Sequence, residues 1–182
     1  MIGRAHAQGA LVYPSIGGWS RSDVFPAMAA SAEGRRNFAK NCVGLIREYN
    51  FDGIDIDWEF PGYEPHGGGP DDTENFILLL EDIRAALDAY ASVTYPGRER
   101  TFGLTAALPC GPQIIDHQDV PRVSAALTEL NLMTYDFHGT WDDKVGINAP
   151  LMDQPEDRFY SPGYSVDGCV ERWVEEGADR AK

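Results

Sequence analysis

The sequence has 182 residues, of which 43% are hydrophobic and 11% aromatic, enough for one domain with a buried core. Its formal net charge is −14 and its basic residues do not cluster, which disfavours phosphate backbones and anionic lipid as partners. We therefore expect neither nucleic acid nor a membrane as partner, and a neutral or polymeric substrate instead.

The first half of the chain predicts two strands, each followed by a helix. Residues 10–19, ALVYPSIGGW, predict a short buried strand that ends in a Gly-Gly turn, and the apolar spacing of residues 32–49 predicts a helix. Residues 53–60, GIDIDWEF, predict the next strand, which Pro61 stops. A helix is expected over about 73–90. Its apolar residues fall on one stripe: Phe76, Leu79, Leu80, Ile83 and Leu87.

The second half continues the alternation. Residues 100–110, RTFGLTAALPC, predict a third strand, a short helix is expected near 119–127, and LNLMTYDF at 130–137 predicts a fourth strand. A long loop rich in Gly, Pro and Asp is expected over 138–167, and residues 168–182 predict an amphipathic C-terminal helix.

Strands that alternate with helices indicate an α/β fold with a parallel sheet and crossover helices. Such sheets are covered on both faces, so their strands are usually apolar throughout. The strand at 53–60 differs because one face is acidic while Ile54, Ile56 and Trp58 occupy the other. In a barrel the acidic face can point into the lumen, so we expect a fold of the (β/α)₈ TIM-barrel family.

The acidic face of this strand is the candidate site. Asp55, Asp57 and Glu59 stand at every second position, about 6.5–7 Å apart along a strand, with Glu59 nearest its C-terminal end. Like charges this close share protons, which can keep Glu59 protonated near neutral pH as a general acid. The alternatives are a hard-cation site built from these carboxylates and a solvated strand edge.

Other strand ends supply possible partners, because catalytic groups of such barrels gather at the C-terminal ends of several strands. Tyr135 can donate a hydrogen bond to a substrate oxygen, and Asp136 can orient the substrate. Trp19, Phe60 and Trp141 lie just past strand ends, where aromatic rings are suitable platforms for the apolar faces of sugars. The alternative for each of these aromatic residues is ordinary packing.

The three cysteines, Cys42, Cys110 and Cys169, lie far apart and lack metal-type spacing. They are either core thiols or include one disulfide pair, and they do not fix a redox compartment. The first residues contain no signal-peptide segment, which is expected of a cytosolic protein or of a chain whose true beginning is missing.

Four sequence elements resemble a known family. FDGIDIDWEFP resembles the D-G-x-D-x-D-W-E-[FY]-P signature of family 18 glycoside hydrolases, the bacterial and fungal type of chitinase. SIGGW resembles the family's S-x-G-G element, MTYDFHG its M-x-Y-D element, and TAALP the strand between them. The resemblance implies a (β/α)₈ barrel, an extracellular enzyme without cofactor or metal, and hydrolysis of β-1,4 bonds in chitin or chito-oligosaccharides with retention. In this family the substrate's own N-acetyl oxygen replaces an enzyme nucleophile.

The resemblance also implies roles for individual residues. Glu59 would protonate the leaving oxygen and later activate water, and Asp57 would orient the acetamido group and stabilise the oxazolinium ion. Asp55 would tune Asp57, and Tyr135 would bind the acetamido oxygen beside Asp136. The residues implied on the substrate side are Gly18, Trp19, Phe60, Ala106, Met133 and Trp141.

Only the third to sixth strands of the family's barrel are recognisable, so we expect residues 1–182 to be a partial catalytic domain. Half a barrel would expose two strand edges and an apolar face, which favours self-association. Three other functions remain open. They are a chitin-binding lectin on the same fold, an endo-β-N-acetylglucosaminidase and a catalytically inactive fragment.

Overall fold

The protein is described by a computed structural model that covers residues 1–97, 101–143, 145–155 and 162–182. Twelve elements follow one another in these ranges: α1 (Ile2–His6), β1 (Ser15–Gly17), α2 (Phe25–Ala29), α3 (Ala32–Tyr49), β2 (Gly53–Asp57), the 3₁₀ helix η1 (Glu64–His66), α4 (Asp72–Thr94), β3 (Gly103–Leu108), α5 (Pro112–Ile115), α6 (Val120–Ala126), β4 (Glu129–Leu132) and α7 (Val166–Glu175). Residue 100, the expected start of the third strand, and residues 144 and 156–161 of the expected loop lie outside the described ranges.

The described strands form one parallel sheet in the order β1-β2-β3-β4, which confirms the parallel α/β architecture. The register places Ser15 beside Asp55, Asp55 beside Thr105, and Thr105 beside Glu129. Since paired residues point to the same face, one row of polar side chains crosses all four strands on the face that carries the acids.

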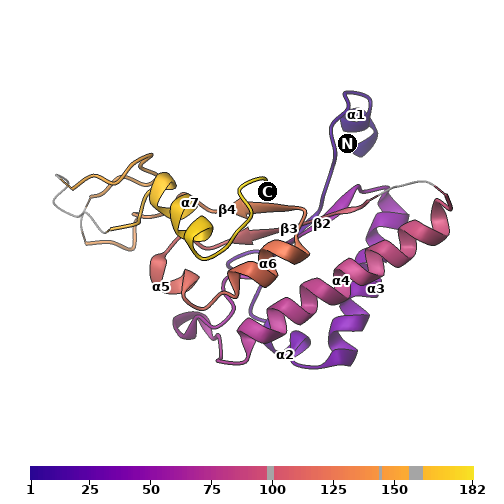
Figure 1. Cartoon of the computed structure of the whole chain (residues 1–182), viewed down its shortest axis with the longest axis horizontal. Coiled ribbons are helices and arrows are strands. Elements are labelled where there is room, and N and C mark those ends of the chain that lie inside the picture. Colours follow the sequence, from indigo (N-terminus) through magenta and orange to yellow (C-terminus); the bar gives the residue numbers. More distant parts are fainter. Residues whose placement is uncertain (98–100, 144, 156–161) are drawn as a thin grey trace.

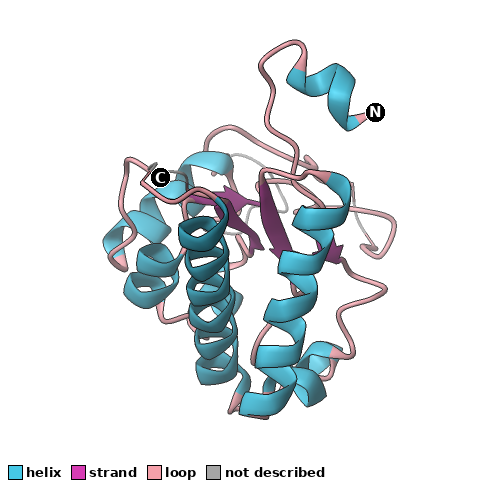
Figure 2. Ribbon diagram, turned by 90° about the vertical axis from the view of Figure 1, so that its right-hand side faces the viewer, coloured by secondary structure: helices cyan, strands magenta, loops and turns pink. Residues whose placement is uncertain are grey.

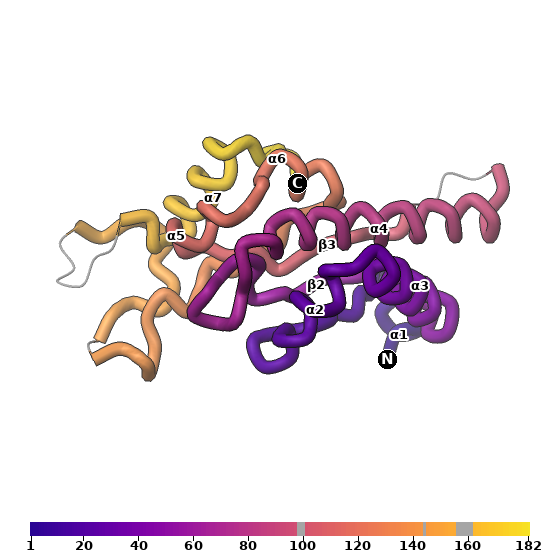
Figure 3. The backbone as a smooth tube through the Cα atoms, turned by 90° about the horizontal axis from the view of Figure 1, so that it is seen from below, coloured from indigo at the N-terminus to yellow at the C-terminus, as the bar shows by residue number. Residues whose placement is uncertain are grey.

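The opposite face of the sheet packs against helices. In Figure 1, α3, α4 and α6 lie together on one side of the strands, and Figure 2 shows long helices standing side by side against the sheet. Seen from below in Figure 3, α2, α3 and α4 lie in front of the strands. The predicted stripe on α4 is fully buried there, with Ile54, Ile56 and Trp58 in the same core. On the acidic face, by contrast, Ser15, Glu129 and Asn131 are exposed.

All four described strands are shorter than expected, and for three of them the structure shows a local reason. Residues 12–14 already run beside β2 and the residue before it, because Val12 O accepts from Asp52 N–H and Pro14 O from Asp55 N–H. Pro14 has no N–H, so it cannot donate a hydrogen bond to β2 in return. β2 ends at Asp57, and two residues later the Glu59 N–H donates to the Ser22 hydroxyl at 3.3 Å instead of to a neighbouring strand. After β4 the chain turns at Asp136, whose φ is 56°.

α1 stands apart from the sheet at the top of Figure 1 and is held by a side chain of the acidic motif. His6 Nε2 lies 2.8 Å from Asp52 Oδ2, and the Val12 N–H donates to the same oxygen at 2.9 Å. Asp52 therefore fixes the segment that leads into β1. Among the described residues, no helix is both long enough and apolar enough to cross a membrane.

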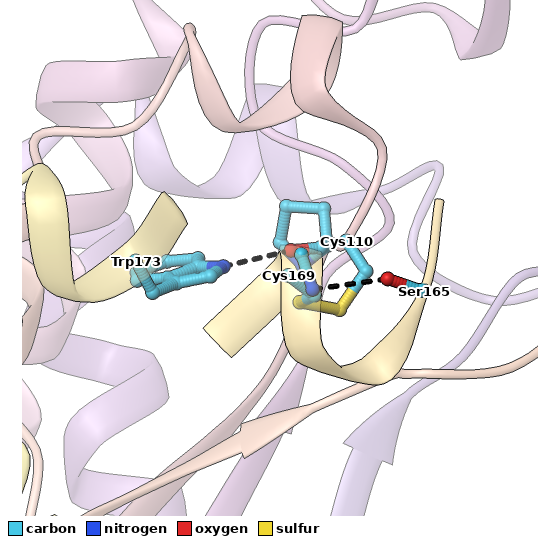
Figure 4. The surroundings of a disulfide bond; sticks show 6 residues. Cys110, Ser165, Cys169 and Trp173 are labelled. Carbon is cyan, nitrogen blue, oxygen red and sulfur yellow. Dashed lines mark hydrogen bonds between the residues drawn. A yellow bond between two sulfur atoms is a disulfide. The ribbon is translucent and has the colours of Figure 1, made fainter. Parts of the chain in front are cut away.

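Of the two alternatives for the cysteines, the structure has the disulfide pair. Cys110, just after β3, forms a disulfide with Cys169 of α7, and Cys42 is a buried free thiol whose pKa burial raises to about 12. Figure 4 shows Trp173 and Ser165 on either side of the disulfide. The Trp173 indole donates to the Pro109 carbonyl at 2.9 Å, so α7 is fastened to the end of β3 by a covalent bond and a buried hydrogen bond.

Candidate active site

The Asp55 carboxylate joins all four strands at the level of the polar row. One oxygen accepts from the Ser15 hydroxyl at 2.6 Å. The other accepts from the Thr105 hydroxyl at 2.6 Å and from the Asn131 amide at 3.0 Å. These donors come from β1, β3 and β4, so the Asp55 carboxylate is held in place from three neighbouring strands. No group of three His, Cys, Asp or Glu side chains in the described ranges could hold a metal ion.

Asp57 lies one step further along the same face and is held mainly by its backbone. The Gly18 N–H donates to the Asp57 carbonyl at 2.8 Å. Gly17 has φ 122°, and a Cβ on it would collide with that carbonyl, which is why this turn requires glycine. Asp57 Oδ1 is buried and accepts no hydrogen bond within the described part of the chain. Burial, and then repulsion by Asp55, raises the pKa of Asp57.

Glu59 follows beyond the end of β2 and is held at several atoms. Its N–H donates to Ser22 Oγ, and its carbonyl accepts from His66 Nδ1 at 2.7 Å. Burial raises the pKa of Glu59 most, and the Asp57 charge raises it further. The Trp19 N–H and His66 oppose this rise without cancelling it. A glutamate with a raised pKa keeps its proton to higher pH, as a general acid must.

Tyr135 lies near these carboxylates, because their charges raise the pKa of its phenol. Partial burial raises the pKa of Tyr135, followed by the charges of Asp57, Glu59, Asp136 and Asp55. The phenol therefore stays protonated and can donate a hydrogen bond, while about half of its side chain is exposed. Asp136 accepts from the Asn148 amide at 2.8 Å, and its charge also raises the pKa of Glu59.

The expected aromatic platforms differ in their surroundings. Trp19 is 54% exposed, and its ring stacks on His66 with a centroid distance of 3.9 Å. Trp141 is 65% exposed in the loop after β4 and lies over Gly139. Phe60 is half-buried, and its ring packs edge-on against Tyr63 with a centroid distance of 6.2 Å.

The remaining substrate-side residues are Gly18, Met133 and Ala106. A Cβ on Gly18 would lie 3.6 Å from Asp57 Oδ2, so this glycine borders the carboxylate directly. Met133 is half-buried, and its N–H extends the pairing of β4 with β3 by donating to Leu108 O at 2.9 Å.

The expected position of Ala106 was wrong. Ala106 pairs with Ile56 and is fully buried in the core on the helix side of the sheet. Thr105 and Ala107 are the β3 residues on the acidic face, because side chains alternate along a strand.

Five residues of the site were not assigned from the sequence. They hold Asp55 or Glu59 in place: Ser15, Ser22, His66, Thr105 and Asn131. For Asn131 a signal existed, since it alternates with Met133 and Tyr135 on one face of the predicted strand. The register that places Ser15 and Thr105 beside Asp55 is a property of the folded sheet.

Three known relatives are similar to the chain over nearly all of its length. Chitinase 1 of Aphanocladium album is 36% identical over 168 residues, which cover 92% of this chain and 38% of that protein. The structure of chitinase ChiA74 from Bacillus thuringiensis matches with a TM-score of 0.88 at 36% identity, over 97% of this chain and 28% of the other. A catalytic domain of the Ostrinia furnacalis Group II chitinase, solved in complex with (NAG)5, matches with a TM-score of 0.85 at 31% identity, over 97% and 45%.

The chain therefore spans less than half the length of each of these relatives. The two solved chitinase structures confirm the predicted fold, in which four parallel strands with their helices follow the TIM-barrel pattern. The sequence model of one family, described as glycosyl hydrolases family 18, matches residues 2–182. This chain belongs to glycosyl hydrolases family 18.

Proposed function

We propose that residues 1–182 belong to the catalytic domain of a chitinase, which hydrolyses β-1,4-linked N-acetylglucosamine polymers with retention. The observation that carries the proposal is the convergence of three groups at the end of β2. Asp57 and Glu59 have raised pKa values, and the Tyr135 phenol senses both charges. Family membership supports the reaction class, and the names of the three relatives support the substrate.

In the first step, protonated Glu59 gives its proton to the glycosidic oxygen as the bond to the anomeric carbon breaks. The acetamido oxygen of the same sugar attacks that carbon, which forms a cyclic oxazolinium ion. In the second step, the Glu59 carboxylate removes a proton from water, the water oxygen attacks the anomeric carbon, and the ring opens. Two inversions give net retention, and Glu59 ends protonated again.

Asp57 and Tyr135 position the acetamido group in this proposal. The buried Asp57 Oδ1 is an acceptor suited to the acetamido N–H, and a carboxylate there stabilises the positive oxazolinium ion. The Tyr135 phenol, kept protonated, is a donor suited to the acetamido oxygen. Asp55, fixed by three donors, supplies the charge that helps to raise the pKa of Asp57.

The exposed rings of Trp19 and Trp141 are the proposed platforms for further sugar units. The (NAG)5 ligand in the Ostrinia furnacalis structure supports a chito-oligosaccharide as ligand for this chain. We also propose an extracellular location, which the Cys110–Cys169 disulfide supports because such bonds persist in oxidising compartments.

The test compares wild type with Glu59→Gln on a chromogenic chito-oligosaccharide. Gln keeps the size of the side chain but cannot donate an acidic proton, so we expect turnover to fall at least about 10²-fold. Glu64→Gln, an exposed glutamate in η1, is the matched control and should keep wild-type turnover. A Glu59→Gln variant with most of the wild-type rate would refute the assigned acid. Binding without turnover in the wild type would instead favour the lectin.

A further inference from the structure

His66 touches both a proposed sugar platform and the proposed catalytic acid. Its ring is nearly parallel to the Trp19 indole, with an interplanar angle of 9° and centroids 3.9 Å apart. Its Nδ1 lies 2.7 Å from the Glu59 carbonyl oxygen. A carbonyl only accepts hydrogen bonds, so Nδ1 must carry the proton, and the two contacts together fix the ring in position and tautomer.

These contacts link three residues: Trp19, Glu59 and His66. The Glu59 carbonyl accepts from His66 Nδ1, the His66 ring stacks on the Trp19 ring, and the Trp19 backbone N–H lowers the pKa of Glu59. Trp19 is more than half exposed, so its indole would otherwise be free to change rotamer. His66 is only partly exposed and comes from η1, which follows Glu59 in the chain.

We propose that His66 is a positioning residue that restrains the Trp19 indole and couples this platform to Glu59. The inference rests on the proposed function in one respect only, namely that the restrained indole binds sugar. Restraint of an exposed ring before binding favours affinity, because less conformational freedom is then lost on binding. His66 thus acts on the ligand through Trp19 and need not touch it.

Three substitutions at position 66 separate the two contacts. His66→Phe keeps a flat ring for the stack but has no donor for the Glu59 carbonyl. His66→Asn keeps an N–H donor near the place of Nδ1 but has no ring, and His66→Ala has neither. His117→Ala is the matched control, since His117 is exposed and its side chain lies beside Gly62.

The first readout needs no ligand and uses the full chain. The ¹⁵N heteronuclear NOE of the Trp19 indole N–H reports how rigid that ring is. We expect it to fall in His66→Ala and His66→Asn, and to stay near the wild-type value in His66→Phe and His117→Ala. An indole that is equally rigid in wild type and His66→Ala would overturn the inference.

The second readout is the affinity for N-acetylglucosamine tetramer, measured by calorimetry. Loss of an aromatic stack corresponds to an affinity about two- to tenfold weaker, expected for His66→Ala, while His66→Phe should stay within about twofold of wild type. Because His66 acts through Trp19, the Trp19→Ala/His66→Ala double variant should bind no more weakly than Trp19→Ala. Independent losses that multiply in the double variant would contradict the coupling. If wild type shows the restrained indole but does not bind the tetramer, the proposed function fails while the restraint by His66 stands.

Discussion

Thr105→Val removes one hydrogen bond from the Asp55 carboxylate and changes almost nothing else. Val has the shape of Thr and suits a strand, and Thr105 is only 3% exposed, so water cannot take the place of its hydroxyl. A hydrogen bond to a charged group contributes about 1.5–3 kcal/mol, and the 2.6 Å distance fits a strong one. We expect the free energy of unfolding to fall by this amount, since the Asp55 carboxylate loses one of its three donors.

The assay is urea unfolding followed by circular dichroism, with Thr101→Val as control. Thr101 is exposed just before β3, so its substitution should change stability by less than about 0.5 kcal/mol. For a chain of this size, a loss of 1 kcal/mol lowers the melting temperature by about 2–4 °C, so we expect Thr105→Val to lower it by roughly 3–12 °C. Equal stability of the two variants would refute the view that hydrogen bonds from the neighbouring strands hold the Asp55 carboxylate in place.

Three further predictions concern stability, binding and assembly. Replacing Cys110 and Cys169 together by Ser should lower the free energy of unfolding by about 4 kcal/mol, the loop-closure estimate for a separation of 59 residues, and an unchanged urea midpoint would contradict this. Trp141→Ala should weaken the binding of N-acetylglucosamine oligomers without altering stability. The control Val145→Ala, at a 91% exposed position of the same loop, should change neither the affinity nor the stability. Equal affinity of Trp141→Ala and wild type would exclude the platform role of Trp141. In the described part of the chain β1 pairs with β2 only, so we expect concentration-dependent association through the sheet edges in sedimentation velocity; one monomeric species at all concentrations would argue against it.

The periodic patterns of the sequence predicted most of the architecture correctly. α3 spans the expected residues 32–49, because its apolar spacing was sustained over several turns. The alternation of acids with Ile54, Ile56 and Trp58 predicted both faces of β2, since only the apolar set can pack against helices. Short helices such as α2 and α5, of 5 and 4 residues, were missed because so few residues show no period.

Features that depend on neighbouring strands could not be predicted in the same way. In β3 the run Ala106-Ala107-Leu108 shows no alternation, so its faces could not be distinguished until pairing with β2 fixed them. The disulfide joins residues 59 apart in sequence, and only the packing of α7 on the end of β3 brings them together. His66 ends the short helix η1 in a segment rich in Gly and Pro that shows no periodic pattern, and its contacts with Trp19 and Glu59 arise from the fold.

The central claim is that burial, together with the charge of Asp57, raises the pKa of Glu59, and the pKa of Glu59 in the folded chain tests it directly. The carboxyl carbon can be followed by ¹³C NMR in glutamate-labelled protein, with Glu59→Gln identifying its signal. We expect a pKa above the ordinary glutamate value, and a lower one in Asp57→Asn, since repulsion by Asp57 is removed while burial remains. A Glu59 that titrates at or below the ordinary value, and does not respond to Asp57→Asn, would contradict the account.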